Sequence, residues 1–286
     1  WLDLLASLES RGIWLDSCSG TVRERLARLV YFSPRLAEIA SARPELIIPL
    51  LKDGALEEHI SNYQLQDALH STTRNGEDPE AAIRFFHRAQ ILRIAWRDLC
   101  NLADIQLITE ELSDLADVII QAVFDLIWKR LAASHGEPGS NESGLPARMA
   151  VIALGKLGGR ELNFSSDIDL MFVYDNQGTT LGGSCSPIEN KKFFTLLAQG
   201  TCDFLGRCST NGFLYRVDTR LRPEGERGEL AVTLSAIEIY YHSYGQNWER
   251  QSLLKARPAA GSPDVGRQFL QLMTPFTYRK YVDEVE

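Results

Sequence analysis

Two aspartates one residue apart, Asp167 and Asp169, have the types and spacing that chemistry at a metal ion requires. They stand where a polar segment meets the apolar run 170–174, which predicts a buried strand. Because successive side chains of a strand point to opposite faces, both carboxylates face one way while Ile168 faces the core. Like charges this close repel each other unless a cation lies between them, and Mg²⁺ prefers such oxygen ligands. The alternative is an Asp-x-Asp pair that is only solvated.

A glycine-rich turn precedes the aspartates and connects two predicted strands. The apolar run 151–154 predicts the first strand, and the turn 155–159 follows it directly. A strand, a glycine turn and Asp-hydrophobic-Asp at the mouth of a second strand resemble the nucleotidyltransferase signature. That signature has a small residue after the first glycine, where this chain has Lys156. The backbone there either approaches a phosphate less closely, or the ammonium contacts a phosphate directly.

A third carboxylate lies farther along, in the predicted strand 213–222. Alternate residues of this strand form an apolar face and a charged face, and the charged face carries Arg216, Asp218, Arg220 and Arg222. Asp218 forms either a salt bridge among the arginines or, beside Asp167 and Asp169, the third ligand of a metal site. The upstream motif favours the metal site. The guanidinium groups suit forked contacts to phosphate oxygens.

Helices are predicted throughout residues 1–133. Helix starts are indicated at Ser33-Pro34, at Asp78-Pro79 and at Asp104, and two more helices are predicted over 44–52 and 56–73. Apolar residues at helical spacing indicate the core of a helix bundle. An arginine run on the helix that starts at Pro79 is interpreted as a solvated face; it comprises Arg84, Arg88, Arg93 and Arg97.

The rest of the chain is divided by composition and pattern. Residues 134–147, rich in Gly, Pro, Ser and acidic residues, predict a linker or surface loop, and 148–234 form the predicted catalytic core. Within that core, a loop over 223–228 is expected to close a hairpin between 213–222 and 229–234. The resulting fold class is α+β, with a helical region before a mixed sheet.

Helices are expected again over 235–286. The sequence Ser235-Ala236-Ile237-Glu238 has the form of a capping box. A helix is predicted to run from Trp248 through Arg257, and Ser262-Pro263 to open the last one. On this segment, Lys255 and Arg257 either reach a bound nucleotide or lie on the surface.

Amino-acid composition limits the kinds of binding partner and the cellular compartment that the sequence is compatible with. The 286 residues are 44% hydrophobic and 24% charged, with a net charge of −8. Nucleic acid is therefore a poor candidate partner, because phosphate backbones call for clustered basic residues. No apolar run approaches the ~18 residues of a membrane span. The five cysteines lack zinc-site spacing, which favours reduced thiols in the cytoplasm. The chain starts and stops in mid-pattern and is interpreted as a fragment of a longer protein.

Four segments together resemble one family more specifically than Asp-x-Asp does. Residues 155–175, 212–230, 247–261 and 275–283 resemble the glutamine synthetase adenylyltransferase/adenylyl-removing enzyme family. The resemblance is strong from residue 148 onward and compatible across the N-terminal helices. It implies two nucleotidyltransferase domains, with polymerase-β-like mixed sheets, in one long chain. One domain attaches AMP from ATP to a tyrosine of glutamine synthetase, and the other removes it by phosphorolysis, giving ADP.

The sequence of this chain resembles the adenylyl-removing half of that family more than the other half. The segment 159–169, which ends Asn-Phe-Ser-Ser-Asp-Ile-Asp, and the closing segment 278–283 both resemble that half. Three other interpretations stay open: the paralogous ATP-dependent half that adds AMP, a polymerase or tRNA-type nucleotidyltransferase, and a non-catalytic module that binds a nucleotide or a signal protein. The acidic net charge counts against the second, and the intact set of carboxylates counts against the third.

The resemblance also implies roles for the candidate residues. Asp167 and Asp169 hold two Mg²⁺ or Mn²⁺ ions, and Asp218 holds the one that lowers the pKa of the nucleophile. Residues implied to bind phosphate or nucleotide are Gly155, Lys156, Ser165, Ser166, Arg216, Arg220, Arg222, Lys255 and Arg257. The implied partners are glutamine synthetase, nucleotide and phosphate, with PII signal protein for the full-length family member. Nucleic acid and membranes are not among them.

Asp167→Asn is expected to abolish turnover without lowering the melting temperature. Removing one of several crowded negative charges relieves repulsion when no metal is bound, so the fold loses nothing. Thermal unfolding of the variant without divalent cations checks this expectation. A large loss of stability would show instead that Asp167 is a structural partner.

Overall fold

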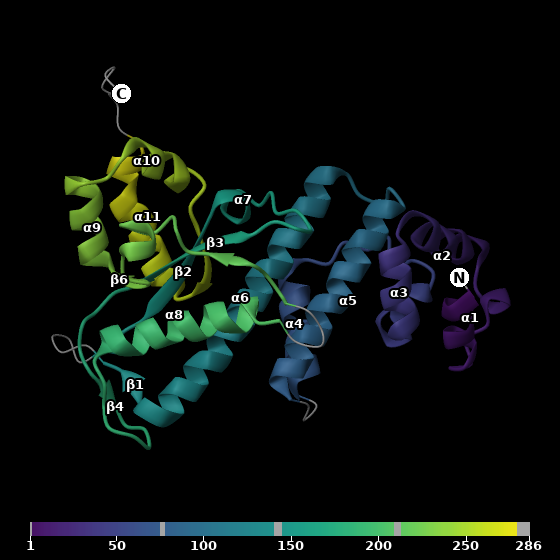
Figure 1. Cartoon of the computed structure of the whole chain (residues 1–286), viewed down its shortest axis with the longest axis horizontal. Helices are drawn as coiled ribbons and strands as arrows, with labels where there is room; N and C mark the ends of the chain where they lie inside the picture. The colour runs from purple at the N-terminus through teal and green to yellow at the C-terminus, as the bar shows by residue number, and fades with distance from the viewer. Residues whose placement is uncertain (1, 75–77, 140–144, 209–212, 279–286) are drawn as a thin grey trace. The chain divides into compact units, whose positions relative to one another are not determined.

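The computed structural model describes residues 2–74, 78–139, 145–208 and 213–278. The chain divides into two compact units, Trp1–Leu115 and Ala116–Glu286. Helices make up the first unit, and helices packed on a mixed sheet make up the second (Figure 1), which confirms the predicted α+β class. None of the helices in the described ranges has the length and apolar character that a membrane span requires.

The first unit is a group of helices around an apolar core. Its elements are α1 (Leu2–Glu9), α2 (Gly20–Phe32), α3 (Pro34–Ala42), α4 (Asn62–Arg74), α5 (Pro79–Leu99), the start of α6 (Ile105–His135), and the short 3-10 turns η1 (Leu15–Ser17), η2 (Pro44–Leu46) and η3 (Ile48–Leu51). The predicted helix starts are confirmed. The side chain of Ser33 accepts from Leu36 N, and that of Asp104 accepts from Leu107 N at 2.8 Å.

Two sequence expectations in this unit are wrong. Residues 44–52 form 3-10 turns rather than a helix, because Pro49 lacks the N–H that a continuing helix requires. The arginine run on α5 is not a solvated face, since Arg93 and Arg97 are 2% and 1% exposed. Both guanidinium groups bind the buried carboxylate of Glu111, each at 3.2 Å. This buried carboxylate compensates the two positive charges.

The second unit is built on a five-stranded sheet. Its strands are β2 (Met149–Leu154), β3 (Ile168–Tyr174), β5 (Val217–Asp218), β6 (Ala231–Thr233) and β7 (Arg257–Gly261). The order is β5-β3-β2-β7, and β6 pairs with β3 on the same edge as β5. β2 runs antiparallel to β3 and β7, whereas β5 and β6 run parallel to β3. A separate pair joins β1 (Glu137–Pro138) to β4 (Thr180–Leu181).

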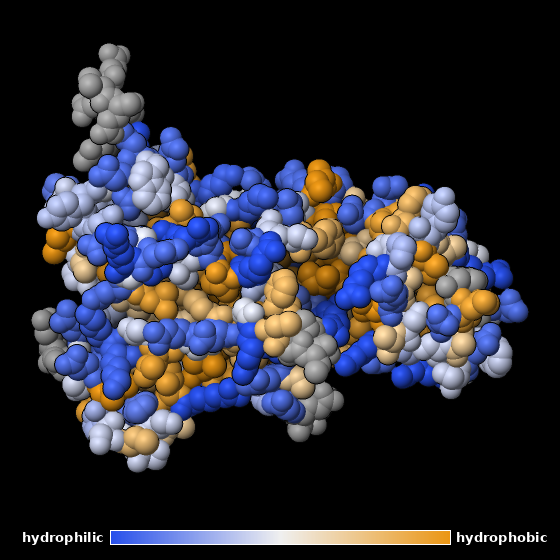
Figure 2. All heavy atoms as spheres, in the orientation of Figure 1, coloured by the Kyte–Doolittle hydropathy of each residue, from blue (hydrophilic) through white to orange (hydrophobic). Residues whose placement is uncertain are grey.

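Helices cover both faces of this sheet. They are α7 (Gly155–Gly158), α8 (Asn190–Gly206), α9 (Leu234–Ser243), α10 (Asn247–Leu253) and α11 (Pro263–Thr277), with the 3-10 turn η4 (Gly225–Arg227). Alternation along β3 sends Met171 and Val173 into one core with α9 and α11. Tyr174 points to the other face, where its ring lies 4.7 Å from that of Phe194 on α8. Figure 2 shows hydrophilic residues along α8 with apolar residues on either side of it.

The predicted strand 213–222 and its hairpin are largely wrong. Only Val217–Asp218 is a strand, and the neighbours Leu214 and Tyr215 are both buried, which breaks the alternation of an amphipathic strand. β6 does not pair with β5; each pairs with a different part of β3. The loop between them is held by Arg222, whose guanidinium donates to the carbonyl oxygens of Thr219, Glu226 and Gly228.

The expectations for the C-terminal segment are partly right. The last helix does start at Pro263, capped by Ser262. α9 is capped by Thr233, whose hydroxyl accepts from Ala236 N at 3.1 Å, so the predicted capping box is wrong. The helix through Arg257 ends at Leu253, and a strand follows, because the residue before a proline favours an extended backbone. The middle of the predicted linker, residues 140–144, and residues 279–283 of the closing segment lie outside the described residues.

Glu111→Ala is expected to destabilise the first unit by about 3–5 kcal/mol, because it leaves two buried guanidinium groups without a compensating charge. Urea unfolding followed by the helical circular dichroism signal measures this. Glu38→Ala is the matched control: Glu38 is 67% exposed in its pair with Arg35. Such a pair contributes about 0–1 kcal/mol. Equal effects of the two substitutions would contradict a special role for the buried cluster.

Candidate active site

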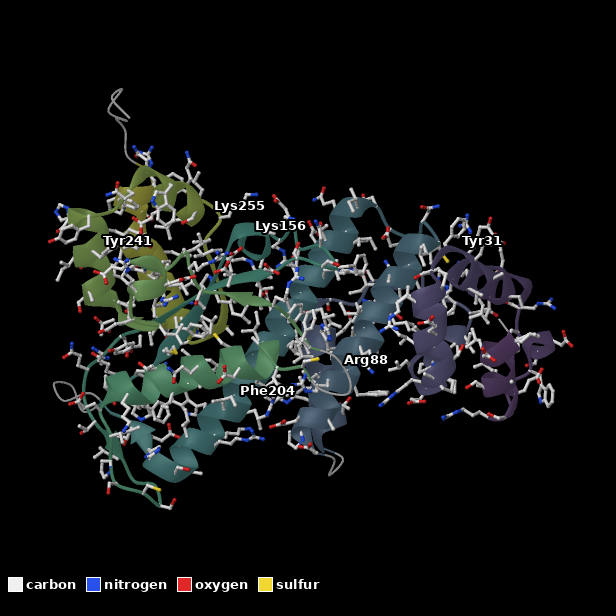
Figure 3. All side chains as sticks on the ribbon, viewed as in Figure 1. Tyr31, Arg88, Lys156, Phe204, Tyr241 and Lys255 are labelled. Atoms are coloured by element: carbon white, nitrogen blue, oxygen red, sulfur yellow. The ribbon has the colours of Figure 1, made fainter. Side chains whose placement is uncertain are left out.

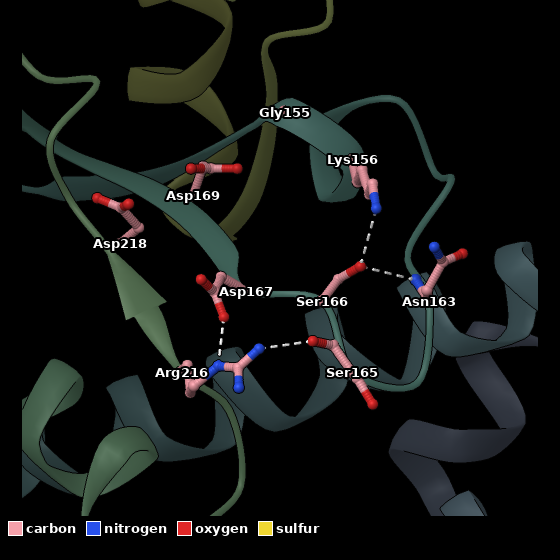
Figure 4. Close-up of a pocket in the computed structure, with 9 residues that line it drawn as sticks. All are labelled: Gly155, Lys156, Asn163, Ser165, Ser166, Asp167, Asp169, Arg216 and Asp218. Carbon is pink, nitrogen blue, oxygen red and sulfur yellow. Dashed lines mark hydrogen bonds and ion pairs between the residues drawn. The ribbon is translucent and has the colours of Figure 1, made fainter.

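A pocket of about 590 Å³ opens at the end of the sheet where the glycine turn and the aspartates meet. Its walls come from α7, from the loop before β3 and from β5 (Figure 4). The lining residues are Gly155, Lys156, Asn163, Ser165, Ser166, Asp167, Asp169, Arg216 and Asp218. All but Asn163 were candidate residues in the sequence. The tertiary structure therefore brings two distant segments, 155–169 and 216–218, into one site.

Strand register explains why the carboxylates meet. Asp169 pairs with Leu154 on one side and with Asp218 on the other. Paired residues on neighbouring strands send their side chains to the same face, so the carboxylates of Asp169 and Asp218 are neighbours. Asp167 precedes β3 by one residue and lies on the same side of the pocket (Figure 4). The register therefore places Asp169 and Asp218 on one face of the sheet, whereas Asp167 lies outside the strand on which it was predicted to share a face with Asp169.

Gly155 lies directly against the central carboxylate. A Cβ on this residue would come within 2.2 Å of Asp169 Oδ2, and its φ of +55° belongs to the left-handed region that glycine adopts without strain. Glycine here lets the backbone approach the carboxylates closely. The first glycine of the turn is therefore required both by the backbone conformation and by the space beside Asp169.

Arginine side chains form ion pairs with the two outer carboxylates, those of Asp167 and Asp218. Arg216 forms an ion pair with Asp167 through Nε and donates from Nη2 to the carbonyl oxygen of Ser165 at 2.7 Å. Arg220 holds Asp218, with its Nη2 2.6 Å from Oδ2 and its backbone N–H 2.8 Å from Oδ1. Both guanidinium groups are largely exposed. They are cations placed beside the carboxylates and open to solvent.

The pKa values of Asp169 and Asp218 are shifted in opposite directions. Partial burial, and then the charges of Asp218 and Asp167, raise the pKa of Asp169. The hydrogen bonds from the Arg220 side chain lower the pKa of Asp218 despite its partial burial. Within the described ranges, the Asp169 carboxylate has no hydrogen-bond or ion-pair partner. It is the group in the pocket that gains most from a further cation.

The carboxylate set suits a divalent cation chemically. Three aspartates offer the hard oxygen ligands that Mg²⁺ and Mn²⁺ take, and the charges of Asp218 and Asp167 disfavour ionisation of Asp169. Within residues 2–74, 78–139, 145–208 and 213–278, no three acidic, His or Cys side chains already surround one point closely enough to hold a metal. The reason is visible in the contacts, because Asp167 and Asp218 turn toward Arg216 and Arg220. A cation would have to replace those ion pairs.

Polar groups line the opposite wall. Lys156 Nζ donates to Ser166 Oγ at 3.4 Å, and Asn163 N donates to the same oxygen at 3.4 Å. Ser166 is thereby oriented by groups on both sides. Asn163 was missed in the sequence. Its position in the polar segment just before Ser165 and Ser166 was the available signal.

Four candidate residues do not line this pocket: Arg220, which contacts it through its ion pair with Asp218, and Arg222, Lys255 and Arg257. Arg222 is 8% exposed, and its guanidinium donates hydrogen bonds to carbonyl oxygens of the 219–228 loop. Lys255 pairs with Glu161 at 2.7 Å, beside the glycine turn (Figure 3). Arg257 binds Asp117 and the carbonyl oxygen of Leu157. These contacts indicate that Arg222, Lys255 and Arg257 support the walls of the pocket.

The order of features is that of the nucleotidyltransferase class: a strand, a glycine turn, Asp-x-Asp at the next strand, and a third carboxylate on its parallel neighbour. Residues 23–272 match the family described as glutamate-ammonia ligase adenylyltransferase. The chain belongs to that family.

Curated relatives agree with this family membership. The chain is 38% identical to a protein of Thioalkalivibrio sulfidiphilus, over 91% of its own length, and 40% identical to one of Hahella chejuensis, over 84%. It is 36% identical to one of Pseudomonas putida over 94% of its length. Each relative is named bifunctional glutamine synthetase adenylyltransferase/adenylyl-removing enzyme. The matched region is 27%, 25% and 28% of these relatives, so the chain spans about a quarter of their length.

Asp169→Asn is expected to raise the melting temperature near neutral pH without divalent cations, by about 2–4 °C for each kcal/mol of repulsion removed. The pKa of Asp169 is raised in the folded protein, so the wild-type chain loses stability as pH rises from the ordinary value of 3.8 through the raised one. The gain should therefore vanish below about pH 3.8, where the wild-type carboxyl is protonated in both states.

Thermal unfolding between pH 3 and 8 measures the effect, and Mg²⁺ provides its control. A bound cation should stabilise the wild-type chain more than the variant. A variant less stable than wild type at neutral pH without metal would show that Asp169 is held by favourable contacts.

Proposed function

We propose that this chain carries a metal-dependent nucleotidyl-transfer site that removes AMP from an adenylylated tyrosine of glutamine synthetase by phosphorolysis, releasing ADP. The observation that carries the proposal is the grouping of three carboxylates in one pocket with the exposed guanidinium of Arg216, while a second exposed guanidinium, that of Arg220, pairs with Asp218. The family match and the relatives' printed names support the substrate. Removal of AMP would release glutamine synthetase from modification and so control nitrogen assimilation.

Asp167, Asp169 and Asp218 would hold Mg²⁺ or Mn²⁺ ions. When bound, such ions supply charge stabilisation at the attacking and leaving oxygens. Lys156 and Ser166 would contact phosphate oxygens from the opposite wall, where their side chains already meet. Gly155 allows a substrate to approach the backbone beside the carboxylates.

The two arginines favour phosphorolysis physically. A free phosphate carries up to two negative charges near neutral pH and must approach a centre lined by carboxylates. Nearby guanidinium groups offset that repulsion and suit forked contacts to phosphate oxygens. Arg216 and Arg220 are both exposed at the pocket and can turn from a carboxylate to an incoming phosphate.

The second candidate is the reverse chemistry, transfer of AMP from ATP to the unmodified tyrosine. The relatives' names include both activities, and the same carboxylates would serve. This direction makes a smaller demand on the arginines, because its nucleophile is a neutral tyrosine. The sequence of 159–169, which resembles that of the removing half, favours the first candidate. Regulation by PII signal protein is proposed only for the longer protein.

The chain, given adenylylated glutamine synthetase, Mg²⁺ or Mn²⁺ and phosphate, is expected to release ADP, and almost none without phosphate. Arg220→Ala should raise the phosphate concentration for half-maximal rate about tenfold or more, because a hydrogen bond to a charged group contributes about 1.5–3 kcal/mol. Its effect on the KM for the protein substrate should be smaller.

Arg267→Gln is the matched control. Arg267 is an exposed arginine on α11 whose partner is the adjacent Asp264, so its removal should leave both constants unchanged. Consumption of ATP with modification of unadenylylated glutamine synthetase would overturn the assigned direction in favour of the second candidate. Failure of both reactions would overturn nucleotidyl transfer by this chain.

A further inference from the structure

A buried ion pair joins three elements behind the glycine turn. Arg257, the first residue of β7, donates from Nη1 and Nη2 to Asp117 on α6 at 2.6 and 3.0 Å. The same guanidinium donates from Nη2 and Nε to the carbonyl oxygen of Leu157 in α7, at 2.9 and 3.2 Å. The Arg257 side chain is 19% exposed and the Asp117 side chain 11%. One arginine therefore connects α6, α7 and β7.

The helix α7 needs such external support. It is a single turn of four residues, and a lone turn has too few internal hydrogen bonds to be stable by itself. The carbonyl oxygen of Leu157, near the end of this turn, accepts a backbone hydrogen bond from Arg160 N at 3.1 Å. The guanidinium of Arg257 adds two further donors to the same oxygen and places a favourable positive charge at the C-terminal end of the turn.

The space around α7 makes its position sensitive. On one side Gly155 lies against Asp169, and on the other a Cβ at Gly158 would come within 2.3 Å of the Lys255 carbonyl oxygen. The helix is thus enclosed between the carboxylates and the segment that leads into β7. A shift of that segment would move α7 and, with it, the Lys156 side chain that lines the pocket.

α6 provides the fixed side of this arrangement. Gln121, one helical turn after Asp117, accepts a hydrogen bond from Gly261 N at 2.8 Å, at the other end of β7. Two residues of one helix face therefore hold both ends of the strand. Asp117 is 8% exposed and lies in the part of α6, 111–120, in which every residue is buried. A buried carboxylate is costly unless it is paired, and Arg257 is its partner.

We propose that Asp117 and Arg257 are a positioning pair that sets α7 so that Lys156 faces the phosphate groups of a bound nucleotide. Neither residue lines the pocket, and both act through the backbone of α7. The proposal rests on the proposed function, in that it takes the pocket to bind a nucleotide.

The test compares Arg257→Gln, Arg257→Lys and Asp117→Asn with wild type in the whole 286-residue chain. Hydrogen exchange is measured for the amides of Gly159 and Glu161, which donate within the turn to Gly155 and Lys156. Binding of ADP with Mg²⁺ is measured by calorimetry. Arg267→Gln again serves as the exposed-arginine control.

Arg257→Gln and Asp117→Asn are each expected to speed exchange of these amides about tenfold, while the amides of β3 keep their wild-type protection. ADP affinity should fall about tenfold in both. Arg257→Lys should lie between wild type and Gln, because an ammonium cannot make the forked contact. Arg267→Gln should match wild type in both measurements.

Unchanged exchange in a folded variant would overturn the proposal, and so would faster exchange with unchanged ADP affinity. If Arg257→Gln fails to fold, Asp117→Asn decides, since it keeps the size of the side chain and removes only its charge. If the wild-type chain binds no ADP, the proposed function of the pocket fails. The exchange measurement then still decides whether the pair positions α7.

Discussion

Repulsion among three carboxylates is the constraint on which the second unit depends. β3 and β5 run parallel with Asp169 opposite Asp218, and Asp167 lies one residue outside the strand. Backbone pairing forces these groups together whatever their charge, because the register of a buried strand cannot slip without exposing its apolar face. Ile168, fully buried between the first two aspartates, anchors that register. The sheet thus brings the three negative charges together at the end of the sheet where β3 and β5 pair.

Arginines supply positive charge near these carboxylates in two kinds of position, on the carboxylates themselves and behind the walls of the pocket. Arg216 and Arg220 lie on the carboxylates themselves and are exposed, so solvent screens their pairs and their side chains can move. Arg257 and Arg222 lie behind the walls and are largely buried. Arg222 donates mainly to backbone carbonyl groups, and Arg257 divides its donors between the carboxylate of Asp117 and the carbonyl oxygen of Leu157. The exposed arginines suit exchange with a ligand, whereas the enclosed ones hold the loops in shape. One residue type therefore serves two purposes, which burial separates.

The sequence alone determined the chemistry of the site and much of the local structure. Asp-x-Asp before an apolar run, the glycine turn, and the helix starts at Pro34, Pro79 and Pro263 depend on neighbouring residues, so their patterns survive without tertiary information. The family, too, is carried by these local segments. Eight of the nine pocket residues were candidates for this reason, and Asn163 was the one missed.

Tertiary structure decided which charges reach the pocket. The alternation in 213–222 suggested a long amphipathic strand, but pairing with β3 extends over only Val217 and Asp218, and Arg222 turns inward to hold its own loop. Arg257 was expected on a helix and lies on a strand, where Asp117 from a helix 140 residues earlier holds it. Such partners are distant in the chain, and a guanidinium has the same sequence signature whether it binds a phosphate, a carboxylate or a backbone carbonyl. Only the packing around it determines which of these it contacts.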